Sequence, residues 1–147
     1  MRIRRPCYVD DSETLGRELF NGHLNKSKTA LTPAAFLQKG GRHLSCSRLS
    51  LAARILFLTL AGQHMNKRRK RVASTRFYGF AEITAANVRA LCVDGLSCAH
   101  PIGVPTIENP FHSDIRLPPD MQKDFFLDVA TKLRNKAKYV PYDVERA

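Results

Sequence analysis

The chain of 147 residues predicts an α+β fold. We expect a single domain over residues 1–147, in which a small, mostly antiparallel sheet packs with a buried central helix and a C-terminal amphipathic helix. Aromatic and alternating residues at 76–83 and 111–117 indicate strands. Apolar residues at helical spacing indicate helices at 50–64 and 120–138. Strands and helices follow no regular βαβ rhythm, which favours α+β over a parallel α/β fold.

A flexible segment and three short elements are expected before residue 50. Residues 1–11 are basic, contain a proline and are expected to be flexible. Residues 11–20 predict a short helix, because two leucines lie four positions apart behind a capping residue. A second short helix is expected within 32–41, where Thr-Pro suits its start and Gly-Gly its end. A short strand is expected around 43–46.

Two longer helices are expected to supply the core. The segment 50–64 is apolar on nearly every side, which is typical of a helix buried at the centre of a domain. In 120–138 apolar residues recur every four positions, and acids precede cations as the helix dipole favours. A shorter helix is expected after Thr84, whose hydroxyl suits an N-cap. Residues 64–75 are expected to form a basic loop that connects the buried helix to the strand at 76–83.

The excess of positive charge lies in the N-terminal half of the chain. The formal net charge is +11, and residues 1–76 carry +12 whereas residues 77–147 carry −1. This asymmetry indicates an acidic partner, which is nucleic acid, an anionic membrane surface or an acidic protein. A membrane partner is disfavoured, because the longest apolar run, 51–62, is shorter than the ~20 residues that span a bilayer. No secretory signal is recognised, so we expect a cytoplasmic protein with reduced cysteines.

The basic run at 67–71 is the leading candidate for contact with a polyanion. Such a run neutralises phosphates without reading base sequence, and its affinity falls with salt. The leading hypothesis is a small accessory or regulatory domain that binds DNA or RNA backbone, as part of a larger complex. The alternative is a solvated connection with no partner. The candidate nucleic-acid or anion-binding residues are Lys67, Arg68, Arg69, Lys70, Arg71, Arg76, Arg42, Arg48 and Arg116.

A second hypothesis rests on the polar face of the strand at 111–117. His112, Asp114 and Arg116 alternate along it and therefore share one face. The candidate catalytic residues are His112 and Asp114, which suit proton transfer. Arg48 or Arg116 would clamp a phosphate group. This hypothesis is a small enzyme or ligand pocket for a phosphate-containing substrate such as a nucleotide, and its alternative is an ordinary solvent-facing strand. A third hypothesis is a protein-interaction subunit that docks an acidic partner.

No metal and no cofactor are expected. Cys92, Cys98 and His100 are close in sequence, but structural zinc sites combine two closely spaced ligand pairs. Here five residues separate the two cysteines, and His112 is the remaining candidate for a fourth ligand. The fixed-spacing motifs of phosphate-binding loops, dinucleotide-binding folds and common hydrolases do not occur. The motifs therefore identify no reaction.

Two short elements give the chain a resemblance to other sequences. A phenylalanine before them and an aromatic strand between them belong to the same pattern. Together these features resemble a group of small, largely uncharacterised bacterial proteins that carry Leu-Ser-x-x-Arg and Asn-Pro-x-His-x-x-Ile elements. The resemblance spans about residues 32–117, implies a bacterial source and implies no named activity. The basic run is not part of it. The positions to which it directs attention are Ser45, Arg48, Asn109 and His112.

Overall fold

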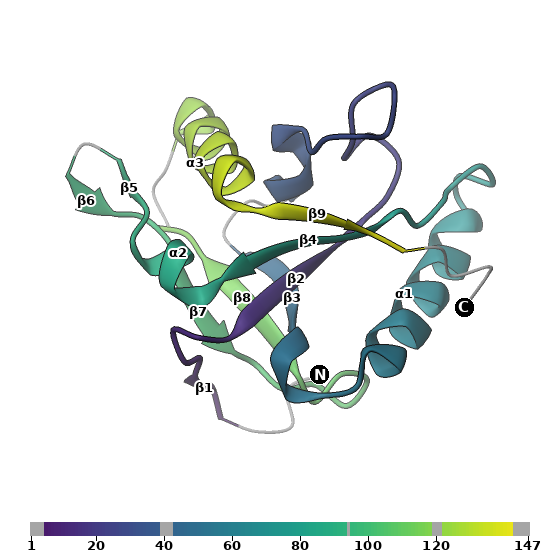
Figure 1. The fold of residues 1–147 in the computed structure, drawn as a ribbon, viewed down its shortest axis with the longest axis horizontal. Helices are drawn as coiled ribbons and strands as arrows, with labels where there is room; N and C mark the ends of the chain where they lie inside the picture. The colour runs from purple at the N-terminus through teal and green to yellow at the C-terminus, as the bar shows by residue number, and fades with distance from the viewer. Residues whose placement is uncertain (1–4, 39–42, 94, 119–121, 143–147) are drawn as a thin grey trace.

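The protein is described by a computed structural model over residues 5–38, 43–93, 95–118 and 122–142. Its main feature is a seven-stranded antiparallel sheet with strand order β1-β7-β8-β3-β2-β4-β9 (Figure 1). The expected α+β class is confirmed. The strands of this sheet are β1 (Cys7–Tyr8), β2 (Thr14–Leu19), β3 (His43–Arg48), β4 (Gly79–Thr84), β7 (His100–Gly103), β8 (His112–Arg116) and β9 (Lys138–Pro141).

Three α-helices, two 3-10 helices and a small hairpin are described beside the sheet. The hairpin pairs two-residue strands and lies between α2 and β7 in the chain. The helices α1 and α3 lie on opposite sides of the sheet (Figure 1). The bounds are η1 (Pro33–Phe36), η2 (Leu49–Leu51), α1 (Arg54–Arg69), α2 (Ala85–Arg89), β5 (Cys92–Val93), β6 (Leu96–Ser97) and α3 (Lys123–Lys136).

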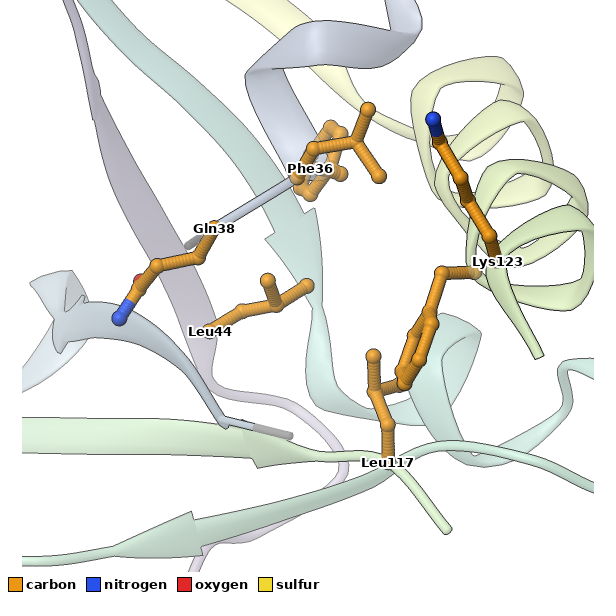
Figure 2. Close-up of a pocket in the computed structure, with 7 residues that line it drawn as sticks. Phe36, Gln38, Leu44, Leu117 and Lys123 are labelled. Atoms are coloured by element: carbon orange, nitrogen blue, oxygen red, sulfur yellow. The ribbon is translucent and has the colours of Figure 1, made fainter. Parts of the chain in front are cut away.

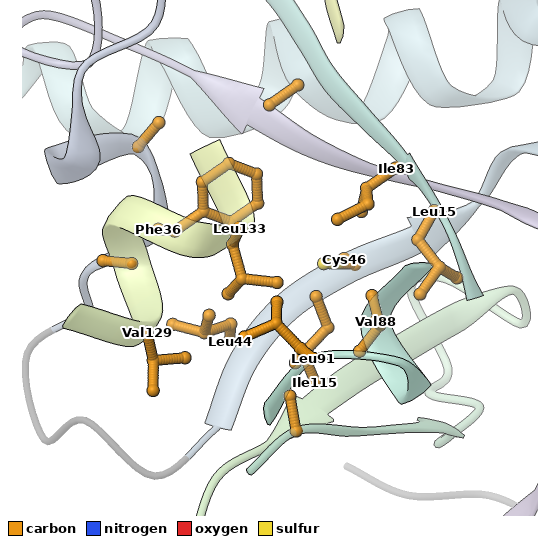
Figure 3. Close-up of a cluster of buried hydrophobic side chains, with 14 of the residues drawn as sticks. Leu15, Phe36, Leu44, Cys46, Ile83, Val88, Leu91, Ile115, Val129 and Leu133 are labelled. Carbon is orange, nitrogen blue, oxygen red and sulfur yellow. The ribbon is translucent and has the colours of Figure 1, made fainter. Parts of the chain in front are cut away.

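The sheet face beneath α3 carries the larger apolar core. Alternation along the strands sends Leu15, Leu19, Ala81 and Ile83 to this face, where η1, α2 and α3 cover them. Figure 3 shows the side chains of this cluster meeting between the sheet and the helices. The expected amphipathic helix is confirmed in α3, because its buried residues repeat on one side at Val129, Ala130 and Leu133.

The opposite face packs against α1 through aromatic rings. Phe20, Phe77 and Phe80 form a chain of ring contacts at 5.9 and 5.3 Å between centroids, and Phe57 of α1 joins the same cluster. The expectation that this helix is buried on nearly every side is wrong. Only one side of α1 is buried, and Ile55 on the outer side is 64% exposed. The helix therefore covers one part of the sheet and is not its centre.

Two expected elements have a different structure from the one predicted. Residues 14–19 form β2 and not a helix, because this segment lies inside the sheet and takes partners on both sides. The basic connecting loop expected at 64–75 is wrong for its first half. The helix α1 continues through Arg69, since Lys and Arg are good helix formers and are favoured near a helix C-terminus.

Other expected elements agree with the structure. The strand around 43–46 is β3, the strand at 111–117 is β8 and most of 76–83 is β4. The hydroxyl of Thr84 accepts a hydrogen bond from the backbone N–H of Asn87 at 3.2 Å, as expected of the cap of α2. The expected glycine stop at 40–41 lies outside the described residues.

The pairing between β2 and β3 is short, and this opens the sheet at its middle. Only Leu15↔Arg48 and Gly16↔Ser47 are paired across these strands, whereas β2 pairs with β4 over six residues. Beyond Gly16 the backbone gap is bridged by the side chain of Arg17, which donates to the carbonyl of Ser45 at 2.9 Å. The two strands therefore part in the middle of the sheet.

Candidate functional site

A groove of about 810 Å³ lies where α1 passes over the parted strands. Pockets of this size accommodate small-molecule or nucleotide-sized ligands. We call it the basic groove, because four Lys or Arg side chains and only two carboxylates line it. Its lining residues are Gly16, Arg17, Glu18, Phe20, His23, Leu37, Gln38, Ser45, Cys46, Ser47, His64, Lys67, Arg68, Arg71, Val72, Thr75, Thr106, Glu108, Asn109 and His112.

The basic run forms one wall of the groove. Lys67 and Arg68 belong to the last turn of α1, and Arg71 follows in the adjoining turn. The guanidinium of Arg68 lies 4.2 Å from the ring centroid of Phe20, a cation–π contact that holds it against the groove. The end of the helix and the turn after it thus present three of the five consecutive cations to one cavity, an arrangement that a solvated loop would not impose.

Arg17 places a buried positive charge at the inner end of the groove. Its guanidinium donates to neutral oxygens, which are the carbonyls of Ala35 at 2.7 Å and Ser45 at 2.9 Å and the amide of Gln38 at 3.2 Å. Burial lowers the pKa of Arg17 from its ordinary value. Among the residues that the structure describes, no carboxylate forms an ion pair with it. The charge of Glu18 acts on Arg17 without an ion-pair contact, so the buried guanidinium can still attract an anion that enters the groove.

His23 lies in the same groove as a neutral imidazole. Its Nδ1 accepts the backbone N–H of Phe20 at 2.9 Å, which leaves the proton on Nε2. Burial lowers the pKa of His23 to about 4, and the positive charges of Arg17 and Arg68 act in the same direction. The ring can therefore donate a hydrogen bond to an anion while it remains uncharged at neutral pH.

His64 of α1 forms a close pair with Glu18 of β2. The Nδ1 atom lies 2.5 and 2.8 Å from the two carboxylate oxygens. The hydrogen bond to Glu18 raises the pKa of His64, against a smaller opposing effect of burial. Because Nδ1–H points at Glu18, the other ring nitrogen, Nε2, is the one available to a ligand.

His112 of β8 forms a second pair of the same kind with Asp114. The Nε2 atom lies 3.0 Å from the carboxylate. Burial raises the pKa of Asp114, but the hydrogen bond from His112 together with nearby positive charge outweighs burial, so the pKa lies below its usual value. His43 and Arg116 add to this lowering. Since an ionised carboxylate only accepts, Nε2 carries a proton, and in the neutral ring Nδ1 has the lone pair.

A short ordered loop holds the groove edge beside His112. The amide nitrogen of Asn109 donates to the hydroxyl of Ser47 at 2.9 Å, and its amide oxygen accepts the backbone N–H of Phe111 at 3.0 Å. Asn109 is buried and fixes the loop that carries Glu108 into the groove. Of the four positions singled out by the resemblance, Ser45, Asn109 and His112 line the groove.

Arg48 is the fourth of these positions, and it does not line the groove. Its guanidinium forms a two-pronged ion pair with Glu13 at 2.8 Å for both oxygens and also donates to the carbonyl of Tyr8 at 3.2 Å. Arg48 pairs with Leu15 across the strands, and paired residues share a face. Its side chain therefore leaves the sheet on the α3 face, opposite to that of His112. The structure therefore does not support the expected pairing of Arg48 with His112 around a phosphate.

The remaining candidate cations lie outside the groove. Lys70 is exposed beside it, and the Nε of Arg69 donates to the carbonyl of Thr75 at 2.8 Å. Arg76 is exposed and lies 5.9 Å from the ring of Tyr78. Arg116 shares the face of His112, as predicted, and its Nε is buried without a described partner. Arg42 lies outside the described residues.

A second, smaller pocket of about 320 Å³ lies between η1, β3 and the start of α3. Its lining is mostly apolar, and Figure 2 shows Phe36, Leu44 and Leu117 around it with the Lys123 side chain at its edge. It brings no pair of titratable groups together, so it offers no acid–base chemistry. The basic groove is therefore the candidate functional site.

The cysteines do not assemble a metal site with the histidines. All four thiols are free, and Cys98 is buried with its sulfur 3.4 Å from the carbonyl of Leu91. Within the described ranges, no three His, Cys, Asp or Glu side chains converge as a metal ion would require. In the same ranges, no helix combines the length and the apolar character needed to cross a bilayer.

The chain matches no protein-family model, no curated protein and no solved structure.

Proposed function

We propose that this protein binds the backbone of nucleic acid in the basic groove, without reading base sequence. The observation that carries the proposal is the position of Lys67, Arg68 and Arg71, which line one wall of a single large groove. Phosphate groups are the anions that arrays of Lys and Arg neutralise most effectively, through release of counterions. Arg17 supports the proposal, because it adds a buried cation that has no described counter-ion.

The proposed setting is the cytoplasm of a bacterium, where nucleic acid is accessible. Four free thiols suit a reducing compartment, and the bacterial source is what the sequence resemblance implies. In this setting the protein acts as an accessory domain of a larger nucleic-acid complex. An acidic protein is the competing partner, since the same cations would attract carboxylates.

The test is a titration of labelled single-stranded RNA, single-stranded DNA and duplex DNA by fluorescence anisotropy at several salt concentrations. The groove variant combines Lys67→Gln, Arg68→Gln and Arg71→Gln. If each side chain contacts one phosphate, this variant should bind more weakly, and the slope of log affinity against log salt should fall by about 3.

The control variant combines Lys132→Gln, Lys136→Gln and Lys138→Gln. These exposed lysines belong to α3 and β9, outside the groove, and their loss changes the net charge equally. The control should keep the wild-type salt slope. Equal weakening in both variants, or no binding of the wild type at low salt, would contradict the proposal. Stronger binding to polyglutamate than to RNA and DNA would favour the acidic protein partner.

A further inference from the structure

Two histidine–carboxylate pairs border the same groove from different elements. His64 reaches Glu18 from α1, and His112 holds Asp114 within β8. Both imidazoles line the groove together with Lys67 and Arg68. Only the second of these pairs is suggested by the sequence, because Glu18 and His64 are far apart along the chain.

The sheet register relates the backbone positions of the two pairs. Gly16, Ser47 and His112 lie in one cross-strand row, so two strand spacings separate Gly16 from His112 by about 10 Å. Glu18 lies two residues, about 7 Å, further along β2 on the same face. His64 comes from α1 and His112 from the sheet, and both line the groove.

We propose that the basic groove cleaves RNA by acid–base catalysis, with His112 as general base and His64 as general acid. This inference rests on the proposed function, because it uses the same groove and the same polyanion. It names RNA as the substrate class, since the ribose 2′-hydroxyl is an internal nucleophile that DNA lacks. Activating it needs only a base, and releasing the 5′-oxygen needs only an acid.

The proposed step is an internal transesterification. Nδ1 of His112 takes the proton of the 2′-hydroxyl while the 2′-oxygen forms a bond to the neighbouring phosphorus. The bond between phosphorus and the 5′-oxygen breaks, and Nε2–H of His64 gives its proton to that oxygen. The products are one strand ending in a 2′,3′-cyclic phosphate and one beginning with a 5′-hydroxyl. No redox change and no other reactant are needed.

The protonation states in the ligand-free protein suit these roles. Asp114 accepts Nε2–H of His112, which leaves a lone pair on Nδ1 for the base. Glu18 accepts Nδ1–H of His64 and raises its pKa, which favours the imidazolium that an acid requires. Glu108 acts in the same direction as Glu18, and Arg68 of the same helix acts against them.

Cations of the groove would stabilise the phosphorane that forms in the transition state. Negative charge accumulates on its non-bridging oxygens, where positioned guanidinium groups are most effective. Arg68 and Arg17 line the groove, and the Nε2–H of neutral His23 adds a further donor. Arg17 adds positive charge at the inner end of the groove, where the carbonyls of Ala35 and Ser45 and the amide of Gln38 hold its guanidinium.

The experiment incubates the full chain with labelled single-stranded RNA, the matched DNA and the matched 2′-O-methyl RNA, all in the presence of a chelator. We expect cleavage of RNA alone, with 2′,3′-cyclic phosphate ends on the product. The variants His64→Gln and His112→Gln should each lower the cleavage rate by about 10²-fold or more. The matched control, His100→Gln, removes an exposed histidine that does not line the groove and should keep the wild-type rate.

The pH profile separates the two roles. Wild-type cleavage should be bell-shaped in pH, the His112 variant should lose the acidic limb and the His64 variant the alkaline limb. The groups facing these rings are Glu18, Glu108 and Arg68 for His64, and Asp114 for His112, with His43 and Arg116 next to Asp114. Persistence of the whole profile in both variants would overturn the assignment.

The outcomes distinguish this inference from the proposed function. RNA that binds in the anisotropy titration but stays intact across about pH 5 to 9, the range in which imidazoles titrate, would overturn catalysis and keep binding. Cleavage of the 2′-O-methyl RNA would overturn the 2′-hydroxyl mechanism, and this test needs no variant to fold. Absence of binding to every nucleic acid would overturn the proposed function itself.

Discussion

The two faces of the sheet differ in how they are covered, although the same strands supply both. The α3 face is covered by η1, α2 and α3 and holds a buried, mostly aliphatic cluster of side chains (Figure 3). The α1 face is covered in part by aromatic contacts and leaves the basic groove open beside them. We infer that the α3 face provides most of the stability, which allows the α1 face to keep an open groove lined by cations and titratable groups.

The largest expected effect is the loss of a buried side chain on the α3 face. Leu133 is fully buried in α3, so Leu133→Ala should lower the free energy of unfolding by about 2–5 kcal/mol. Leu127 lies on the same helix with 49% of its surface exposed, and Leu127→Ala should cost under about 1 kcal/mol. Urea denaturation measures both, and equal costs would refute the division between the two sides of α3.

Acid should destabilise the protein through the α1 face. The folded pKa of His23, about 4, lies below the ordinary value of 6.5. As pH falls through 6.5 the unfolded chain binds a proton that the folded chain refuses, so stability falls by about 3 kcal/mol between pH 6.5 and 4. The variant His23→Gln should show a flatter dependence over this window in urea denaturation. An unchanged slope would show that other groups cause the acid sensitivity.

A smaller effect is expected from the cap that joins β4 to α2. The Thr84 hydroxyl satisfies the N–H of Asn87, and α2 buries Ala85 and Val88 on the α3 face. Thr84→Ala should therefore cost about 1 kcal/mol, whereas Thr84→Ser, which keeps the hydroxyl, should cost less. Thermal unfolding compares the two variants, and similar losses in both would point to packing of the methyl group and not to capping.

The smallest effect on stability is expected in the groove itself. Lys67 and Arg71 are exposed, so replacing either by Gln should change the free energy of unfolding by no more than about 0.5 kcal/mol. The same changes should weaken nucleic-acid binding in the titration described above. A large loss of stability would indicate that these cations stabilise the fold, and would contradict the inference that the α3 face provides most of the stability.

The sequence was sufficient for elements whose local signals agree with their environment. β4 and β8 alternate, α3 repeats every four residues and Thr84 caps α2, and all four were predicted. β2 was misread as a helix because Leu15 and Leu19 are spaced four apart, a pattern that also fits alternate residues of a strand. β9 was not foreseen, because its pairing with β4 depends on where α3 ends.

The groove was only partly accessible to sequence reasoning. Alternation along the strand placed His112 beside Asp114, and charge density singled out Lys67 and Arg68. The pairing of His64 with Glu18 could not be foreseen, because it depends on β2 being a strand and on α1 crossing that face. The sequence also showed no sign that Arg48 forms an ion pair with Glu13 in place of binding a phosphate, since Glu13 is distant in sequence.

The parted strands also bear on how the chain reaches its native state. β2 is joined to its sequence neighbour β3 by only two residue pairs, so its main partner is β4. Thr14 pairs with Thr84, and Ser47 pairs with His112, which are contacts between residues separated by nearly half the chain. Such non-local pairings are slow to form, and folding times of about milliseconds to seconds are expected. During synthesis β2 is therefore made well before β4, the strand with which it forms most of its pairs.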